Sequence, residues 1–270
     1  MKTILITGGS GFIGSNLIKT LSKSYNIIAI LRYNSDSSTI ESFCQIYRYK
    51  DTTDLLEQLK DKEFIGLIHL ATLYKKTHKI GDIKGIIDSN ITFGSEICEI
   101  LSLLKFNGWF INVGTFWQFY KNMPNNPINL YAASKSAFNS ILNFYANTTN
   151  ITFSTIYLND TYGPNDTREK IFNLWLKFAN SGETLEMSKG EQLIDMIYID
   201  DVINAFIVLI DLLNSQYKTL AKDKIFALHT KDRKTLRELA NIFEEVVGKK
   251  LNILWGAKPY MQRENFIPFE

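Results

Sequence analysis

Residues Met1–Gly14, MKTILITGGSGFIG, decide the fold. Thr3–Ile6 is a short apolar run typical of a strand buried on both faces, and Phe12–Leu21 is predicted to be a helix. Between them, glycines stand at positions 8, 9, 11 and 14. A strand, a glycine turn and a helix start bring free backbone N–H groups and the positive end of the helix dipole to one point, which suits a pyrophosphate. We therefore expect a dinucleotide here; its contacts are Gly8, Gly11, Phe12, Ile13 and Gly14.

The composition excludes several classes of protein. Of the 270 residues, 45% are hydrophobic, as in ordinary globular chains, and the net charge of +2 without a basic block argues against a nucleic-acid partner. The apolar run Ala205–Ile210 is too short to span a bilayer, and the N-terminus does not resemble a signal peptide, so no membrane association is expected. Two cysteines, Cys44 and Cys98, without CxxC spacing indicate a reducing cytoplasm. The three histidines lack metal-ligand spacing, and we expect no metal site.

Strands and helices alternate along the first 161 residues, which predicts a Rossmann-type α/β fold with a doubly wound parallel sheet. The expected strands after the first are Asn26–Leu31, Cys44–Tyr49, Phe64–Leu70, Trp109–Val113 and Thr152–Leu158. The expected helices after Phe12–Leu21 begin near Asp54 and cover Asp88–Lys105 and Ile128–Ala146. From residue 162 the pattern changes to turns and short pieces. We expect residues 1–161 to bind the cofactor and residues 162–270 to form a small substrate-binding lobe, part of which returns to the sheet.

The end of the second strand bears on the choice of cofactor. NAD-binding units place Asp or Glu there for the ribose 2′-hydroxyl, but this chain has Arg32. A guanidinium suits a 2′-phosphate, so we expect NADP, with NAD as the alternative and a plain surface arginine as the simplest explanation. Asp51 either accepts from the adenine amino group or caps a helix. Leu70 and the small Ala71 end a strand where a dinucleotide can lie flat, whereas His69 is expected in the core.

Three residues predict the chemistry. Tyr131 and Lys135 are four apart on one helix and so share a face. A tyrosine has an ordinary pKa near ~10, and a nearby ammonium and an oxidised nicotinamide are together expected to bring this pKa toward the working range. The lysine also suits the nicotinamide ribose hydroxyls. Thr115 follows the fifth strand directly, at the carboxyl edge of the sheet, where its hydroxyl can align a substrate carbonyl.

Taken together, the motifs TGGSGFIG, HLA, YAASK and YGPND resemble the extended short-chain dehydrogenase/reductase family of nucleotide-sugar enzymes. The resemblance covers nearly the whole chain. It implies that Thr115, Tyr131 and Lys135 are catalytic, that carbon 4 of a sugar is oxidised or reduced, and that the C-terminal lobe grips the nucleotide diphosphate. A homodimer is also expected.

The branch of the family follows from the residues after Thr115. The 4,6-dehydratases have Asp and Glu there, whereas this chain has Phe116 and Trp117, which removes the acid and the base of that reaction. Residues 114–118, 158–164 and 187–192 look most like the CDP-abequose and CDP-paratose synthases, which reduce 4-keto-3,6-dideoxy sugars with NADPH. Many sister enzymes carry Arg where Ile194 stands. The remaining candidates for the substrate are Asn159, Lys170, Gln192 and Arg263, the last three of which are equally plausible as plain surface residues.

The expected function is NADPH-dependent reduction of the 4-keto group of a nucleotide-activated deoxysugar, CDP-4-keto-3,6-dideoxyglucose-like, in surface polysaccharide and O-antigen biosynthesis. The chain has an aromatic cluster that consists of Phe116, Trp117, Phe119 and Tyr120. These side chains either contact the apolar side of such a sugar or fill the core behind the site. The first alternative is an NAD-dependent nucleotide-sugar 4-epimerase. A second alternative, a catalytically silent NADP-binding regulator, is disfavoured by the intact trio.

Overall fold

The computed structural model describes residues 1–269, and its centre is a sheet of seven parallel strands. Their spatial order is β11-β6-β5-β4-β1-β2-β3. The strands are β1 (Thr3–Thr7), β2 (Asn26–Arg32), β3 (Gln45–Tyr49), β4 (Gly66–His69), β5 (Trp109–Thr115), β6 (Thr152–Leu158) and β11 (Lys224–Leu228). The chain builds outward from β1 to β3 and then adds β4 on the other side of β1. The sheet is therefore doubly wound, as predicted, with its switch point between β1 and β4, the place where such sheets bind ligands.

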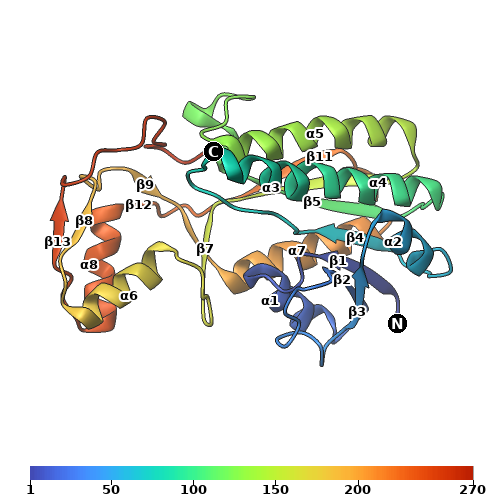
Figure 1. The fold of residues 1–270 in the computed structure, drawn as a ribbon, viewed down its shortest axis with the longest axis horizontal. Coiled ribbons are helices and arrows are strands. Elements are labelled where there is room, and N and C mark those ends of the chain that lie inside the picture. The colour runs from blue at the N-terminus through green and yellow to red at the C-terminus, as the bar shows by residue number, and fades with distance from the viewer. Residues whose placement is uncertain (270) are drawn as a thin grey trace.

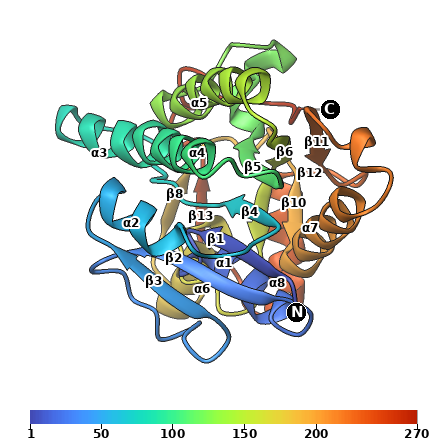
Figure 2. The same ribbon diagram turned by 90° about the vertical axis from the view of Figure 1, so that its right-hand side faces the viewer.

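Helices cover both faces of the sheet, which explains why its inner strands are continuously apolar (Figure 2). On one face lie α1 (Phe12–Leu21) and α7 (Ile199–Asn214). On the other lie α2 (Thr52–Leu59), α4 (Phe93–Leu103) and α5 (Leu130–Thr148), while the short α3 (Ile83–Ile87) precedes α4. Among residues 1–269, no helix is both long and apolar enough to cross a membrane.

A smaller lobe stands apart from the sheet at one end of the molecule (Figure 1). It contains α6 (Ile171–Ser181), β8 (Leu185–Met187), α8 (Leu236–Val247) and β13 (Ile253–Trp255). Its own core is built around Trp175, which is fully buried against Leu185, Leu236 and Ala240. Between the lobe's two halves, the chain returns to the main body as α7 and β11, and β11 pairs with β6.

Two short ladders connect the lobe to the sheet. β7 (Asp160–Tyr162) pairs with β10 (Met196–Tyr198), and β9 (Leu193–Ile194) pairs with β12 (Lys234–Thr235). The strands β7, β9 and β12 were not predicted from the sequence, because strands of two or three residues are too short to show an alternation.

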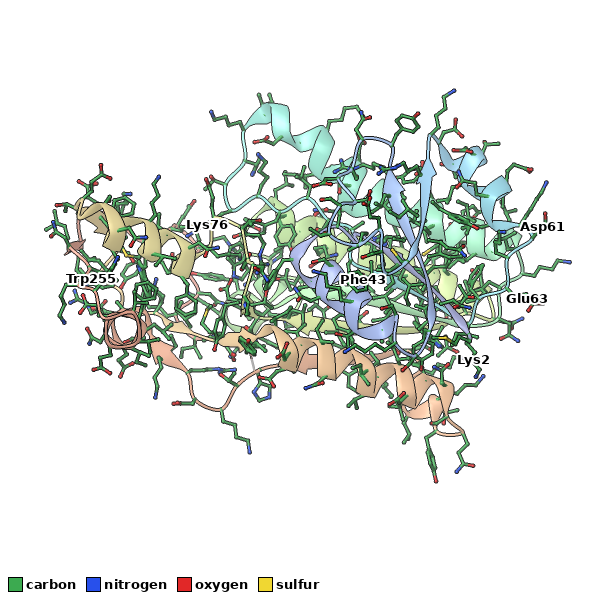
Figure 3. All side chains as sticks on the ribbon, turned by 90° about the horizontal axis from the view of Figure 1, so that it is seen from below. Lys2, Phe43, Asp61, Glu63, Lys76 and Trp255 are labelled. Atoms are coloured by element: carbon green, nitrogen blue, oxygen red, sulfur yellow. The ribbon has the colours of Figure 1, made fainter. Side chains whose placement is uncertain are left out.

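The carboxyl edge of the sheet faces the lobe. In Figure 3, Lys76, which follows β4, lies between Trp255 of the lobe and Lys2, Asp61 and Glu63 at the amino edge. A hollow of about 740 Å³ lies at that amino edge, and its lining contains none of the predicted site residues. The candidate chemistry is thus confined to the edge that the lobe faces.

Candidate active site

The glycine turn packs directly against the end of β4. Gly8 has a φ of +68°, and a Cβ built on it would stand 2.6 Å from the backbone N of Ala71, so only glycine fits. A Cβ on Gly14 would meet the Gly8 carbonyl oxygen at 2.3 Å. Gly11 caps α1 without a side-chain hydrogen bond, which leaves the first N–H groups of the helix free for an anion. The turn therefore has the shape to fit a pyrophosphate and lies against Leu70 and Ala71, and their contacts with a cofactor stay predictions.

The Phe12 ring is covered by Arg168, which lies in the loop between β7 and α6. The Arg168 guanidinium carbon lies 4.4 Å from the centre of the Phe12 ring. Arg168 also pairs with Asp166 at 2.7 Å and donates to the Thr161 carbonyl oxygen at 2.9 Å. This stack links the glycine turn to the lobe, and the sequence analysis missed it because Arg168 is remote in the chain.

Two arginines meet where β2 ends. Arg32 is exposed, and its guanidinium makes no hydrogen bond or ion pair within residues 1–269. Arg48, on β3, was not predicted to have a role. Its Nη1 donates to the carbonyl oxygens of Arg32, Tyr33 and Ser35 at 3.3, 2.8 and 2.8 Å, and its Nη2 donates to Ser37 Oγ at 3.0 Å. Arg48 thus braces the loop and leaves Arg32 available to an anion.

Asp51 caps α2, which is one of the two interpretations left open above. Its Oδ1 accepts a hydrogen bond from the Asp54 backbone N at 2.9 Å. A contact between Asp51 and adenine stays a prediction.

Tyr131 and Lys135 are both buried on α5. The Lys135 ammonium is unpaired within residues 1–269, and burial lowers its pKa to about 8. Burial and the Asp160 charge raise the pKa of Tyr131 to about 12, although the Thr72 and Thr115 hydroxyls act in the opposite direction. Without the cofactor, desolvation outweighs the favourable neighbours, and a pKa of Tyr131 nearer neutrality stays a prediction for the protein with an oxidised nicotinamide bound. The phenol stays protonated and is suited to donate.

Thr115 ends β5 and is held by a residue whose role the sequence did not indicate. The Gln118 side chain is buried, and its Oε1 accepts from the Thr115 backbone N at 2.9 Å. Its Nε2 donates to Ser136 Oγ at 3.2 Å and to Tyr157 Oη at 3.5 Å. Gln118 therefore ties the end of β5 to α5 and β6, which fixes Thr115 beside Tyr131.

A second buried amide, that of Asn90, is connected to Tyr131 through Ser134. Asn90 lies in a π-helical turn, Asp88–Thr92, a rare feature frequent at functional sites. Its Oδ1 accepts from Thr72 Oγ1 at 2.9 Å and from the Leu73 backbone N, while its Nδ2 donates to Ser134 Oγ at 2.9 Å. Ser134 Oγ in turn donates to the Tyr131 carbonyl oxygen at 2.7 Å. Asn90 thus joins the segment after β4 to α5.

His69 is a core residue, as predicted. It is fully buried and exchanges a hydrogen bond with Thr7 Oγ1 at 2.9 Å. Burial lowers its pKa to about 3, so the ring is neutral at physiological pH. Among residues 1–269, no three His, Cys, Asp or Glu side chains come together in an arrangement that could hold a metal ion.

Three of the four other predicted substrate residues carry a buried polar atom without a hydrogen-bond partner among residues 1–269. These atoms are Asn159 Oδ1, Gln192 Oε1 and Arg263 Nε. Outside the predicted substrate residues, the property is shared by His69 Nε2, Asn112 Oδ1 and Asn265 Nδ2. Such groups cost free energy unless a ligand or water satisfies them. The fourth, Lys170, instead pairs with Asp160 at 2.9 Å.

Two of the four residues of the predicted aromatic cluster, Phe119 and Tyr120, are covered by the C-terminal segment, residues 263–269. Phe269 stacks on Phe119 with ring centroids 4.2 Å apart, and the Arg263 guanidinium lies 4.4 Å from the centre of the Tyr120 ring. Phe119 and Tyr120 therefore pack against this segment. Phe116 is buried with 9% of its surface exposed, whereas the Trp117 ring stands 6.4 Å from that of Tyr131.

Residues 4–220 match the NAD dependent epimerase/dehydratase family. The chain belongs to this family, whose members are extended short-chain dehydrogenases/reductases. It is 30% identical over 274 residues to a CDP-abequose synthase of Yersinia pseudotuberculosis, covering 98% of this chain and 91% of the relative. It is 30% identical over 216 residues to a CDP-abequose synthase of Salmonella typhimurium, covering 77% of this chain and 70% of the relative.

Solved structures share the fold. One is UDP-glucose 4-epimerase from Thermotoga maritima with UDP-glucose, at a TM-score of 0.84 and 20% identity, covering 99% of this chain and 89% of that one. Another is UDP-glucuronic acid 4-epimerase from Bacillus cereus in complex with UDP-glucuronic acid and NAD, at a TM-score of 0.85, 20% identity and the same coverage. At this identity they show the fold alone.

Proposed function

We propose that this protein is an NADPH-dependent reductase that converts the ketone at carbon 4 of a nucleotide diphosphate deoxysugar into an alcohol. The observation that carries the proposal is the buried Tyr131 on α5, which interacts with the Thr115 hydroxyl, lies one helical turn before the buried Lys135, and has its pKa raised by burial to about 12. A reduction needs a proton donor at the carbonyl oxygen, and this phenol is one. Bound NADPH supplies the hydride.

In this mechanism, the residues of the chain bind, orient and protonate. Thr115 donates a hydrogen bond that aligns the carbonyl oxygen beside the Tyr131 phenol. Tyr131 gives its proton to that oxygen as carbon 4 gains hydride, so the ketone becomes a neutral alcohol. The buried Lys135 ammonium would hold the nicotinamide ribose hydroxyls of a bound cofactor and would favour the phenolate that remains, which would lower the cost of the transfer.

The proposed substrate class rests on the relatives and on the residues after Thr115. Phe116 and Trp117 provide neither an acid nor a base for dehydration. Relatives at 30% identity are named CDP-abequose synthases. Asn159, Gln192 and Arg263 carry the unsatisfied polar atoms that a nucleotide diphosphate sugar would pair. We assign the substrate to these residues and a CDP-linked 4-keto-3,6-dideoxy sugar to the site.

The proposed cofactor rests on the loop after β2. Arg32 ends β2, its guanidinium makes no hydrogen bond or ion pair within residues 1–269, and Arg48 braces the loop that follows. No acidic side chain ends β2 to bind a free ribose diol. A 2′-phosphate would meet a charge-assisted contact there.

The competing function is a 4-epimerase with tightly held NAD, which is favoured by the fold shared with such enzymes. The two differ in what leaves the protein, because a reductase releases its oxidised cofactor in every turnover. The test is to purify the protein, extract its nucleotides and follow NADPH absorbance with a panel of 4-keto nucleotide sugars. Oxidation of NADPH by a protein free of stoichiometric NAD supports the proposal, whereas bound NAD and no NADPH oxidation would overturn it.

A further inference from the structure

Arg168 has hydrogen-bond donors that the fold itself does not use. Its Nε and Nη2 both donate to Asp166, each at 2.7 Å, and Nη2 also donates to the Thr161 carbonyl oxygen at 2.9 Å. Its Nη1 makes no hydrogen bond or ion pair within residues 1–269. Since 34% of the Arg168 side chain is exposed, against 6% of that of Asp166, the guanidinium is open to a ligand while its carboxylate partner is not.

The loop that carries Arg168 is held in place by its own hydrogen bonds. Asp166 Oδ1 accepts from the Arg168 backbone N at 3.1 Å. Asn173 Nδ2, on α6, donates to the carbonyl oxygens of Asp166 and Arg168 at 2.5 and 2.8 Å. The guanidinium is thus oriented before a ligand binds, which lowers the entropic cost of a contact with it.

The guanidinium lies at the glycine turn. Its Cζ atom is 4.4 Å from the centre of the Phe12 ring, and Phe12 is the first residue of α1. The first N–H groups of this helix are the ones that suit a pyrophosphate, and Gly11 has no side chain to cap them. Arg168 therefore places a cation beside the anion site of the turn.

A second neighbour places Arg168 between the turn and the proposed proton donor. Burial raises the pKa of the Tyr74 phenol, whereas the Arg168 charge acts in the opposite direction, so the guanidinium lies near Tyr74 as well as Phe12. The Tyr74 ring in turn meets the Tyr131 ring edge-on, with centroids 5.1 Å apart. A dinucleotide with its nicotinamide beside Tyr131 and its adenosine beside Arg32 has its pyrophosphate in the interval between them, where Arg168 lies.

We propose that Arg168 binds the pyrophosphate of the dinucleotide, with Nη1 as the donor, and so completes the phosphate site that the glycine turn begins. The inference deepens the proposed function and rests on it only for the presence of a dinucleotide, so it holds for NAD and NADP alike. A guanidinium makes strong, charge-assisted hydrogen bonds to phosphate oxygens. The diphosphate of the nucleotide sugar is the competing ligand for the same donors.

The test measures the affinity of the cofactor-free protein for four probes by isothermal titration calorimetry. ADP-ribose and 2′-phospho-ADP-ribose contain the pyrophosphate of the cofactor, adenosine 2′-phosphate lacks it, and CDP represents the diphosphate of the substrate. Arg168→Leu should weaken binding of both ADP-riboses by roughly 10- to 100-fold, the effect of losing charge-assisted hydrogen bonds. Its affinity for adenosine 2′-phosphate should be unchanged, which also shows that the variant is folded.

Two further variants control for structural effects. Arg168→Lys keeps a cation beside Asp166 but lacks the planar fork, so it should lose part of the affinity for the ADP-riboses. Arg237→Leu is the matched control, because the Arg237 guanidinium also stacks on an aromatic ring, that of Trp255 at 4.8 Å, but lies in the lobe. It should bind both ADP-riboses like the wild type.

The outcomes distinguish this inference from the proposed function. Equal loss of affinity for adenosine 2′-phosphate and 2′-phospho-ADP-ribose in Arg168→Leu, or no loss for either, would overturn the inference, because Arg168 would then only support the loop. A loss for CDP with unchanged affinity for both ADP-riboses would overturn it too and assign Arg168 to the substrate. A wild type that prefers ADP-ribose to 2′-phospho-ADP-ribose would contradict the NADPH assignment alone, since Arg168→Leu should still weaken ADP-ribose by the same factor.

Discussion

Lys135 lies one helical turn beyond Tyr131 on α5, and the two side chains leave only 3% and 9% of their surfaces exposed. An ammonium buried this deeply without an ion pair costs stability, and its lowered pKa shows this cost. Perturbed groups of this kind gather at functional sites. The pair gives the structure its clearest sign of catalysis, and the first predictions concern it.

The first prediction concerns the proton donor. Tyr131→Phe should lower kcat by about 10²- to 10⁴-fold, because general acid catalysis contributes that much. NADPH affinity should barely change, since the phenol is not proposed to hold the dinucleotide. Tyr145→Phe is the matched control on the same helix, since Tyr145 bonds Glu99 far from this site. Steady-state kinetics and NADPH titration measure both, and normal turnover by Tyr131→Phe would refute the mechanism.

Lys135 is predicted to act both in cofactor binding and in the proton transfer from Tyr131. Lys135→Met should weaken NADPH binding and lower kcat together, because one ammonium is proposed to hold the ribose and to stabilise the phenolate. Fluorescence titration with NADPH and single-turnover kinetics separate the two effects. If Lys135→Met binds NADPH with wild-type affinity, the ribose contact is wrong.

The pKa of Lys135 also predicts how stability depends on pH. Burial lowers this pKa from 10.5 to about 8, so between these pH values the unfolded chain holds a proton that the folded protein has released. The contribution of Lys135 to stability therefore rises with pH over this window, by about 3 kcal/mol in total. Lys135→Met should stabilise the cofactor-free protein below pH 8 and flatten the rise above it. Urea unfolding at several pH values measures this, and Lys222→Met, at an exposed lysine, should show neither effect.

The loop after β2 provides a further prediction. Arg32→Ala should weaken NADPH binding by roughly 10- to 150-fold, equivalent to about 1.5–3 kcal/mol for a charge-assisted contact, and leave NADH nearly unaffected. Arg48→Ala should reduce the same preference by loosening the loop. Because Arg48 is proposed to act only through the position of Arg32, the double variant should lose less than the sum of the two single losses. Lys23→Ala, at an exposed lysine after α1, is the control. Equal affinity of the wild type for NADPH and NADH would contradict the cofactor assignment.

The parts of the fold that depend on neighbouring residues could be predicted from the sequence. The helix Phe12–Leu21 and the strand Thr152–Leu158 have the predicted bounds, because glycine turns and apolar runs are local features. The predicted helix Ile128–Ala146 begins two residues later, at Leu130, since the Asn129 side chain caps it by accepting from the Ala132 backbone N at 2.9 Å.

The parts of the site that depend on distant partners could not be predicted. Arg48, Asn90 and Gln118 act through hydrogen bonds whose partners only the folded sheet and helices bring near. Tyr74 meets Tyr131 across more than fifty residues of chain, and no spacing rule predicts such a contact. The raised pKa of Tyr131 in the cofactor-free protein could not be predicted for the same reason, because the sequence shows the lysine but not the depth of burial.

The central claim is that hydride from NADPH reaches carbon 4 of the sugar. The most direct test supplies NADPH deuterated at both hydrogens of nicotinamide carbon 4, together with a CDP-linked 4-keto-3,6-dideoxy sugar, and analyses the product by mass spectrometry and NMR. The account predicts one deuterium at carbon 4 of every product molecule and one NADPH oxidised for each. A product without deuterium, or interconversion of sugars with no net oxidation of NADPH, would contradict it and indicate the epimerase.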